Sequence, residues 1–529
     1  MLKSLKDGVG CEVVGVLDDV SLAGPPREVF AAFDKLRTMA HNHHLPLRVD
    51  KCVALWPLQD QESFRTLLNN TDVGAEEGCM TLLGTAVGNV PAKISEWVRD
   101  KVESWAPPLR DLQSPVVPAQ VALLLARTYA TAKPNFLTRS LPPIYTKEPL
   151  HQHDEEVLSA VASKLNLDFS APGVEAMLRL PFSWGGAGFT SSAAVSDHGF
   201  VASMATTLPY IAATRLRDAD LPSLATVKEL EASLAEISQY SPEGCPTDVA
   251  GFVGKFSVGH KDAFGLQSNL GKRFASRVVL QVSQGGAQMR SLLAARTDCP
   301  EAAAPFRAYP LTAEFTLTDD EMRFAVAHAT NAKIPETPSK CTCDADFSLG
   351  HAVLCDCKMV LARHNRLQNR IAAFARVQGA TVVGNPRLTI EEAANRQEPD
   401  LLLFIGTSPP LEVDVTVTDP LCPSRQSSWL KSGASLRTAE QRKRNKYELD
   451  AGTRSHEFAP LAFETYGRTG SDVLKLLRRL AANTPGEVGL SATDMMMELQ
   501  IELLKGNAEC GRVVFARALA QQDKARRRR

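Results

Sequence analysis

Five potential metal ligands crowd into one short stretch of this 529-residue chain, and they constrain its local fold more than any other feature. Cys341, Cys343, His351, Cys355 and Cys357 follow one another in the pattern C-x-C-x7-H-x3-C-x-C. Clustered Cys and His residues in a reducing compartment indicate a metal site rather than disulfides, and structural zinc takes four nitrogen or sulfur ligands. We predict Zn²⁺ on Cys341, Cys343, His351 and Cys355, with Cys357 as the alternative ligand. Buried or incidental thiols are the remaining explanation.

A spaced acidic pair follows the cysteine cluster. Pro399-Asp400 opens an apolar segment, thirteen residues separate Asp400 from Asp414, and the intervening TSPP suits a turn. The two segments are therefore predicted to pair as a hairpin that brings both carboxylates together. Strand alternation places Glu412, Asp414 and Thr416 on one face of the second strand, so plain solvent exposure is an alternative to a site.

Carboxylates at one edge of a sheet suit the hydrolysis of phosphodiester bonds with a divalent cation. A lysine nearby would stabilise the charge that develops on the phosphate. We therefore predict Asp400, Asp414 and Glu412 as catalytic acids, with Mg²⁺ (or Mn²⁺) as cofactor. Glu392, in the helical segment upstream, could add a further carboxylate.

Basic residues gather in two places, although the formal net charge of the chain is only −1. Residues 431–446 hold six basic residues against one acid, and residues 523–529 hold five against one. Such runs are usually solvated surface, but beside a nuclease-type core we predict that Arg442, Lys443 and Arg444 contact nucleic acid. The first run also offers Lys446, our predicted catalytic lysine, with Lys443 as the alternative. The terminal run could equally be a nuclear-localisation patch.

A second acidic pair lies near the N-terminus. The segment CEVVGVLDDVSLAG predicts a hairpin with Asp18 and Asp19 at its tip, followed by a helix over 26–44. The next segment, LPLRVDKCVALWP, predicts a strand with Lys51 near its middle. Polymerases place paired aspartates on such a hairpin to bind two catalytic metal ions.

These segments together resemble the C-terminal part of the polyprotein of early-branching, site-specific non-LTR retrotransposons. VLDD, the helix and LPLRVDKC are similar to the last part of a reverse transcriptase palm, with Asp18, Asp19 and Lys51 as its remnant. LPFSWGGAGF resembles the Gly-Gly segment of the thumb and connection region. PD-x13-D with the later FETYG is similar to the restriction-like endonuclease that ends such polyproteins.

The resemblance implies a nuclear protein that nicks target DNA, with element RNA and possibly a full-length reverse transcriptase chain as further partners. The palm strand that carries the third metal-binding aspartate of the family is not in this sequence. We therefore expect no copying of RNA by this chain, and nicking as the surviving activity. A catalytically inactive nucleic-acid-binding relic and an unselected product that does not fold stably are the alternatives.

The expected fold class is a mixed α/β multidomain chain. It would combine a truncated reverse-transcriptase palm, a helical thumb/connection region, a small zinc element and a PD-(D/E)xK-like α/β endonuclease core. The corresponding ranges are 1–70 for the palm remnant, 71–240 for the thumb/connection region, 241–338 for a linker region, 339–360 for the zinc element, 361–470 for the endonuclease and 471–529 for a helical C-terminal region with the basic tail. The sequence has no apolar run of signal-peptide or membrane-spanning type, so we expect a soluble intracellular protein without a membrane partner.

Overall fold

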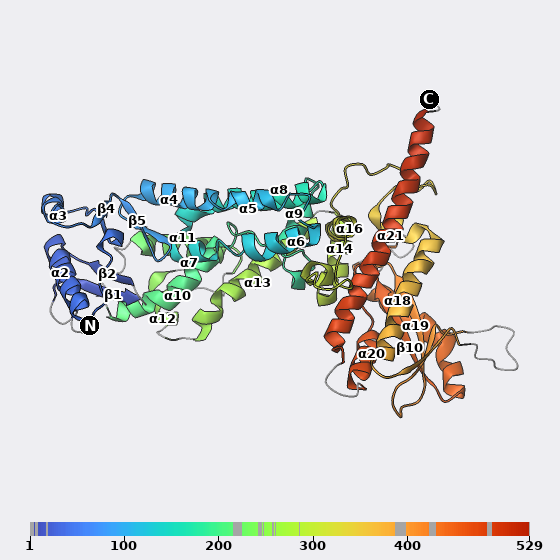
Figure 1. Cartoon of the computed structure of the whole chain (residues 1–529). Helices are drawn as coiled ribbons and strands as arrows, with labels where there is room; N and C mark the ends of the chain where they lie inside the picture. Colours follow the sequence, from blue (N-terminus) through green and yellow to red (C-terminus); the bar gives the residue numbers. More distant parts are fainter. Residues whose placement is uncertain are drawn as a thin grey trace.

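The structure is a computed structural model, and it describes residue 5 and residues 9–16, 19–214, 225–241, 246, 248–256, 259, 261–284, 286–386, 398–422, 430–483 and 489–527. It is a mixed α/β chain in which helices predominate and the sheets are small, as the sequence predicts at this level. Figure 1 shows an elongated molecule, with the N-terminal strands at one end and helices in the middle. A four-stranded sheet and the long C-terminal helix lie at the other end.

The N-terminal end contains the predicted hairpin. Strands β1 (Glu12–Val16) and β2 (Asp19–Ala23) pair antiparallel with Val16 opposite Asp19, and helix α2 (Pro26–Asn42) follows with Pro26 in its first turn. Both elements are therefore confirmed. Asp19 is exposed at the hairpin end, whereas Asp18 lies outside the described residues.

Lys51 does not lie in a strand, contrary to the sequence prediction. It ends the short 3-10 helix η1 (Val49–Lys51), and the strand β3 (Val53–Leu55) begins two residues later. Strand β3 pairs with β4 (Gly74–Glu76) in a separate sheet from the β1–β2 hairpin. A turn closed by hydrogen bonds to the carbonyls of Arg48 and Val49 thus overrides the strand propensity of the neighbouring apolar residues.

Helices form the middle of the molecule. Helix α3 (Gln61–Leu68) precedes the hairpin of β5 (Cys79–Leu82) and β6 (Thr85–Gly88). The helices that follow the hairpin are α4 (Pro91–Glu103), α5 (Ala106–Asp111), α6 (Ala119–Leu125), the π-helix η2 (Ala126–Ala130), α7 (Asn135–Ser140), α8 (Pro143–Leu165), α9 (Val174–Arg179), η3 (Phe182–Trp184), α10 (Ser196–Thr214) and α11 (Ala225–Ser238). The Trp184-Gly185-Gly186 segment is a turn between α9 and α10, with Gly185 at a φ of 83°.

Residues 241–338, for which the sequence predicts a linker region, are largely helical where they are described. Their elements are α12 (Val249–Lys255), α13 (Lys261–Gln284), α14 (Ala287–Arg296), η5 (Pro300–Ala303), α15 (Ala304–Arg307) and α16 (Asp319–Thr330). Helix α16 begins with a capping box, in which Thr318 and Glu321 satisfy each other's backbone N–H groups. Apolar residues of α13, α14 and α16 are buried in cores shared with the preceding helices. This region is therefore part of the folded helical body and is not a linker.

A four-stranded sheet in the order β10-β9-β8-β7 forms the centre of the C-terminal end. Its elements are α17 (Leu349–Cys355), α18 (Cys357–Val377), β7 (Thr381–Gly384), β8 (Leu401–Phe404), β9 (Leu411–Thr418), α19 (Ala434–Thr453), β10 (Glu457–Glu464), α20 (Ser471–Ala482) and α21 (Ala492–Arg527). Strands β7, β8 and β9 are antiparallel neighbours, while β10 returns parallel to β9 after the crossover helix α19. The short apolar runs ATVVG, DLLLFIG, LEVDVTV and FAPLAFET, each bounded by turn residues, predict four strands, and β7 to β10 confirm all four.

The core of this sheet also fixes the helix that precedes it. Leu367, Ile371 and Phe374 recur at helical spacing on α18 and are buried against the strands, together with Leu476 and Leu480 of α20. Fully burying one such side chain contributes roughly 1.5–3 kcal/mol. The register of α18 on the sheet is therefore set by its apolar face, and this determines which of its polar residues reach the strands.

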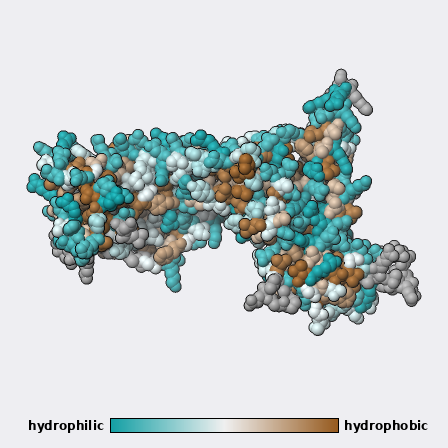
Figure 2. All heavy atoms as spheres, in the orientation of Figure 1, coloured by the Kyte–Doolittle hydropathy of each residue, from teal (hydrophilic) through white to brown (hydrophobic). Residues whose placement is uncertain are grey.

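Helix α21 joins the parts of the C-terminal end. It contacts α16, α17, α18 and α20, and in Figure 1 it runs along them from the lower part of this end to the C-terminus. None of the helices in the described ranges is long and apolar enough to cross a membrane. Figure 2 shows a mainly hydrophilic surface with scattered hydrophobic groups on the face it displays.

Candidate metal centre and acidic site

The four predicted zinc ligands come from a tight loop and a short helix. Cys341 and Cys343 lie on a loop closed by the N–H of Cys341 on the carbonyl of Ala345, at 2.9 Å, and by the N–H of Asp344 on the carbonyl of Cys341, at 3.0 Å. His351 and Cys355 are four residues apart on α17, so they share one helical face. The hydroxyl of Ser348 caps the start of α17 by accepting from the backbone N–H of His351.

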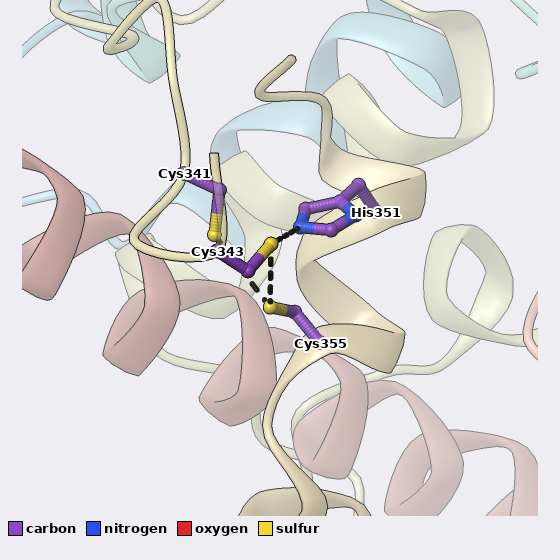
Figure 3. A group of neighbouring side chains, drawn as sticks. All are labelled: Cys341, Cys343, His351 and Cys355. Atoms are coloured by element: carbon purple, nitrogen blue, oxygen red, sulfur yellow. Dashed lines mark hydrogen bonds between the residues drawn. The ribbon is translucent and has the colours of Figure 1, made fainter. Parts of the chain in front are cut away.

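These side chains converge on one point, as Figure 3 shows. Their ligand atoms all lie within 4.8 Å of one another. The Cys355 sulfur is 3.6 Å from the sulfurs of both Cys341 and Cys343, and Cys343 Sγ is 3.2 Å from His351 Nε2. Tetrahedral zinc with Zn–S bonds of about 2.3 Å would hold two sulfurs about 3.8 Å apart. Three thiols and one imidazole in this arrangement could therefore hold a metal ion such as zinc. Of the fifth candidate, Cys357, the side chain lies outside the described residues.

The thiols do not behave as independent groups. Burial opposes ionisation of Cys341, but hydrogen bonds from the Cys343 backbone and from His351 prevail and lower the pKa of its thiol to about 6. Burial and the neighbouring sulfurs raise the pKa of Cys355 to about 12. One thiolate among proton-bearing neighbours is a starting point for metal binding, which releases the remaining protons.

Packing holds the cysteine cluster against α21. Cys341, Ala352 and Val514 form a small buried cluster, and the rings of Phe347 and Phe515 meet edge to face at 5.7 Å. Asp356, directly after α17, caps α18 by accepting from the backbone of Lys358 and Met359, and it also pairs with Arg517 of α21. The cluster is thus connected to the start of α18 and to the C-terminal part of α21.

The predicted hairpin brings Asp400 and Asp414 to neighbouring strands. Leu401 of β8 pairs with Val413 of β9, so Asp400, one residue earlier, comes level with Asp414, one residue later. Asp414 is only 3% exposed, which excludes the alternative of a solvent-facing acid. Burial raises the pKa of Asp414, the negative charge of Asp400 raises it further, and Lys443 opposes both effects.

Asp400 is held by the main chain and by α18. Its Oδ2 accepts from the N–H of Val415 at 2.6 Å and lies 3.0 Å from Nε2 of His364. The hydrogen bond from His364 to this carboxylate raises the pKa of the imidazole above its ordinary value. Gln368, four residues along α18, donates to the carbonyl of Asp400 at 2.8 Å. Two polar residues on one helical face therefore fix both the backbone and the side chain of Asp400.

Lys443, rather than the predicted Lys446, faces the acidic pair. Lys443 Nζ is 2.6 Å from Oδ2 of the buried Asp414. Lys446 is exposed, and it donates instead to the hydroxyl of Tyr447 at 2.7 Å, with its charge 4.4 Å from the ring centre. Burial and the charge of Asp414 raise the pKa of Tyr447 to about 12. The orientation of α19 decides between the two lysines, and the spacing of basic residues in the sequence does not reveal it.

Glu412 does not join Asp400 and Asp414, contrary to the prediction. It is fully buried, and Arg454 grips it with two hydrogen bonds of 2.8 Å, while His456 Nδ1 lies 2.8 Å from the same carboxylate. Residues two apart on a strand share a face but are displaced by about 6.6 Å along it. Glu412 therefore meets the residues that follow α19 instead of the acidic pair.

The remaining predicted residues are dispersed. Arg442 is exposed on α19, whereas Arg444 pairs with Glu448 at 3.0 Å and also with Asp472 of α20. Glu392 lies outside the described residues. The sequence did not lead to His364 and Gln368. Their four-residue spacing on a helical segment is a signal for a shared face, but nothing in the sequence shows which strand that face meets.

The acidic pair is not a preformed cation site. Among the described residues, only the four Cys/His side chains gather closely enough as a group of three or more potential ligands. Asp400 and Asp414 each contact a basic side chain instead, His364 and Lys443 respectively. The donor chemistry of two carboxylates suits Mg²⁺, but the geometry alone does not support a bound Mg²⁺.

Comparisons with known proteins do not place the chain in a family. No protein-family model matches it, and no curated protein matches its sequence.

Proposed function

We propose that this chain is a divalent-metal-dependent DNA endonuclease derived from a non-LTR retrotransposon protein. The observation that carries the proposal is the position of Asp400 and Asp414, level with each other on strands β8 and β9, with the Lys443 ammonium against Asp414. Two carboxylates and a lysine at one place in a sheet are the groups that metal-assisted phosphodiester hydrolysis requires.

In this proposal Asp400 and Asp414 would hold Mg²⁺ (or Mn²⁺), which would polarise the phosphate and lower the pKa of a water molecule. With a cation on the two carboxylates, Lys443, which pairs with Asp414 in the structure, would be available to stabilise the negative charge on the scissile phosphate. His364 and Gln368 are positioning residues, because both hold Asp400 from α18. Tyr447 keeps its proton at neutral pH and closes the site beside Asp414.

The Cys/His cluster contributes structure in this proposal. Zn²⁺ on the four side chains would fix α17, whose last residue directly precedes the cap of α18. Helix α18 carries His364, so the cluster would help to orient Asp400 from a distance. Target DNA is the substrate, element RNA and a full-length reverse transcriptase chain are further partners, and the nucleus is the compartment that such a target implies.

Polymerase activity is not part of the proposal. Asp19 lies at the end of the β1–β2 hairpin, but Lys51 lies in a turn that leads to a different sheet. Asp19 and Lys51, which the resemblance assigns to a palm, therefore do not lie on one common sheet.

Nicking of supercoiled plasmid by the full, zinc-loaded chain tests the proposal. We expect nicking with Mg²⁺ or Mn²⁺, no nicking when the added divalent cation is left out, and its loss in Asp400→Asn and Asp414→Asn. Glu457→Gln is the matched control, because Glu457 starts β10 in the same sheet but pairs with Arg479 at 2.5 Å. Equal nicking by all four proteins would indicate a contaminating nuclease and would remove the proposed function.

The second candidate is a nucleic-acid-binding protein without catalytic activity. It is favoured by the ion pairs that Asp400 and Asp414 already make with His364 and Lys443. Tight DNA binding without nicking, unchanged in Asp414→Asn, would identify this alternative.

A further inference from the structure

A second site lies in the helical middle of the molecule, far along the chain from the acidic pair. It is a cavity of about 390 Å³ formed by α5, α6, η2 and α8, and its walls are mostly apolar. In Figure 2, hydrophobic groups reach the surface near the place that Figure 1 labels α6. Pockets of this size with few polar groups are typical of small-molecule sites.

Two aromatic rings and one cation stand together at this cavity. Trp105 is only 5% exposed, whereas Tyr129 is 50% exposed at the opening. The Lys133 ammonium lies 5.5 Å from the ring centre of Trp105 and 4.9 Å from that of Tyr129, and it donates to the Tyr129 hydroxyl at 2.9 Å. Flat rings bind other flat rings by stacking, and an ammonium beside them attracts an anion.

The inner wall offers an unused hydrogen-bond acceptor. His153 is 1% exposed, packs edge to face on Trp105 at 5.2 Å, and its Nε2 donates to the carbonyl of Ala130 at 3.1 Å. Because Nε2 carries the proton in that hydrogen bond, Nδ1 carries a lone pair. Nδ1 has no hydrogen-bond partner among the described residues. A buried polar atom of this kind is costly unless a water molecule or a ligand satisfies it.

The backbone at the cavity is also unusual. Residues Ala126–Ala130 form a π-helix, in which the N–H of Thr131 reaches back five residues to the carbonyl of Ala126 at 3.1 Å. Single π-turns inserted into α-helices occur frequently at functional sites. This turn supplies Tyr129 to the opening and the Ala130 carbonyl to His153, so it builds both the aromatic and the polar part of the cavity.

We propose that this cavity binds a nucleotide, with its base on the aromatic wall beside Lys133 and its phosphate on the Lys133 ammonium. His153, whose Nδ1 has no partner among the described residues, and Asp111 both line the cavity, and acceptors at these two positions would select a base with an exocyclic amino group: adenine, cytosine or guanine. A wholly apolar ligand would offer neither a hydrogen bond to His153 nor a negative charge to Lys133. The nucleotide is either free or part of a single strand, since both present the same base and phosphate. The inference is independent of the proposed nuclease function.

Isothermal titration of the full, zinc-loaded chain with nucleoside monophosphates tests the inference. We expect AMP, CMP or GMP to bind more tightly than UMP, and adenosine more weakly than AMP because it lacks the phosphate. Tyr129→Ala and Lys133→Gln should each weaken binding by about tenfold or more, as loss of one stacking partner does elsewhere. Lys101→Gln is the matched control, because Lys101 lies 6.0 Å from the ring of Trp97, outside the cavity.

A single-stranded oligonucleotide of the best base separates the two sources of the ligand. Binding of the oligonucleotide but not of the mononucleotide, weakened in both variants, identifies a base within a strand. Binding of both, with competition between them, identifies a site for free nucleotides. Absence of binding for every probe, or binding that Tyr129→Ala and Lys133→Gln leave unchanged, overturns the inference, as does binding of an apolar dye alone that is insensitive to Lys133→Gln.

Discussion

At the scale of single residues, burial decides what the acidic side chains can do. Asp414 and Glu412 are both buried on β9. Asp414 pairs with Lys443, whereas Glu412 pairs with both Arg454 and His456. The sequence could predict that these acids share a strand face, because strand alternation is local. It could not predict their partners, because these come from α19 and from the residues that follow it.

Lys443 and Lys446 provide a test at this scale. Lys443→Met should reduce nicking by about a hundredfold, because it removes the cation next to the buried Asp414, whereas Lys446→Met should change nicking only severalfold. Single-turnover nicking of a plasmid measures both variants. The reverse order of effects would restore Lys446 as the catalytic lysine and contradict the assignment of Lys443.

At the scale of elements, short apolar runs predict where strands and helices lie better than where each of them begins and ends. The strands β7 to β10 lie where the sequence predicts them, because their apolar runs are clear and turn residues flank them. Helix α21 continues to Arg527, because buried residues such as Val514 and Ala518 extend its packing. The strand predicted around Lys51 begins only at Val53, because a hydrogen-bonded turn over Val49–Lys51 interrupts the apolar run.

The cysteine cluster should couple zinc to the stability of α17 and the start of α18. The purified chain is expected to contain one zinc per molecule, and Cys343→Ser should lose it, since zinc-site binding energy is folding energy. Elemental analysis gives the zinc content, and limited proteolysis around residues 341–357 gives the loss of structure. Cys79→Ser is the control, because Cys79 lies in β5, outside the cluster. Unchanged zinc content in Cys343→Ser would exclude the site.

The basic run on α19 should contribute unequally to DNA binding. Arg442 is exposed, whereas Arg444 already pairs with Asp472 and Glu448. Arg442→Gln is therefore expected to reduce the slope of log affinity against log salt concentration by about one, and Arg444→Gln to reduce it less. Fluorescence anisotropy with a labelled duplex between 50 and 200 mM salt, about the range over which phosphate contacts weaken, measures both slopes. Equal slopes for wild type and Arg442→Gln would remove this residue from the DNA interface.

At the scale of the whole molecule, the C-terminal sheet is joined to the helical middle through a buried aromatic stack. His328 of α16 lies between Phe324 and Tyr466, with ring centres 5.2 and 4.1 Å apart. Tyr466 follows β10, and Arg468, two residues later, donates to the carbonyl of Thr297 at 2.6 Å. The sequence could not predict this junction, because its residues are about 140 positions apart.

This junction should weaken in acid. Burial lowers the pKa of His328 to about 3, below the value of about 6.5 in an unfolded chain. The unfolded state therefore binds a proton between these values and the folded state does not, so stability falls as pH falls below about 6.5. The loss at pH 5 is about 2 kcal/mol. His328→Phe keeps a ring in the stack, and its melting temperature should fall less than that of the wild type between pH 7 and pH 5. An equal fall in both proteins would show that His328 does not carry this dependence.

The single-turnover nicking rate at saturating DNA, for wild type and Asp414→Asn side by side, tests most directly whether Asp400 and Asp414 form a catalytic site. Saturation removes differences in DNA affinity, so the comparison reports catalysis alone. We expect Mg²⁺- or Mn²⁺-dependent nicking by the wild type and no detectable nicking by Asp414→Asn, with equal DNA binding by both proteins. Nicking at the same rate by both proteins, or none by a folded, zinc-loaded and DNA-bound wild type, would contradict a catalytic site at Asp400 and Asp414.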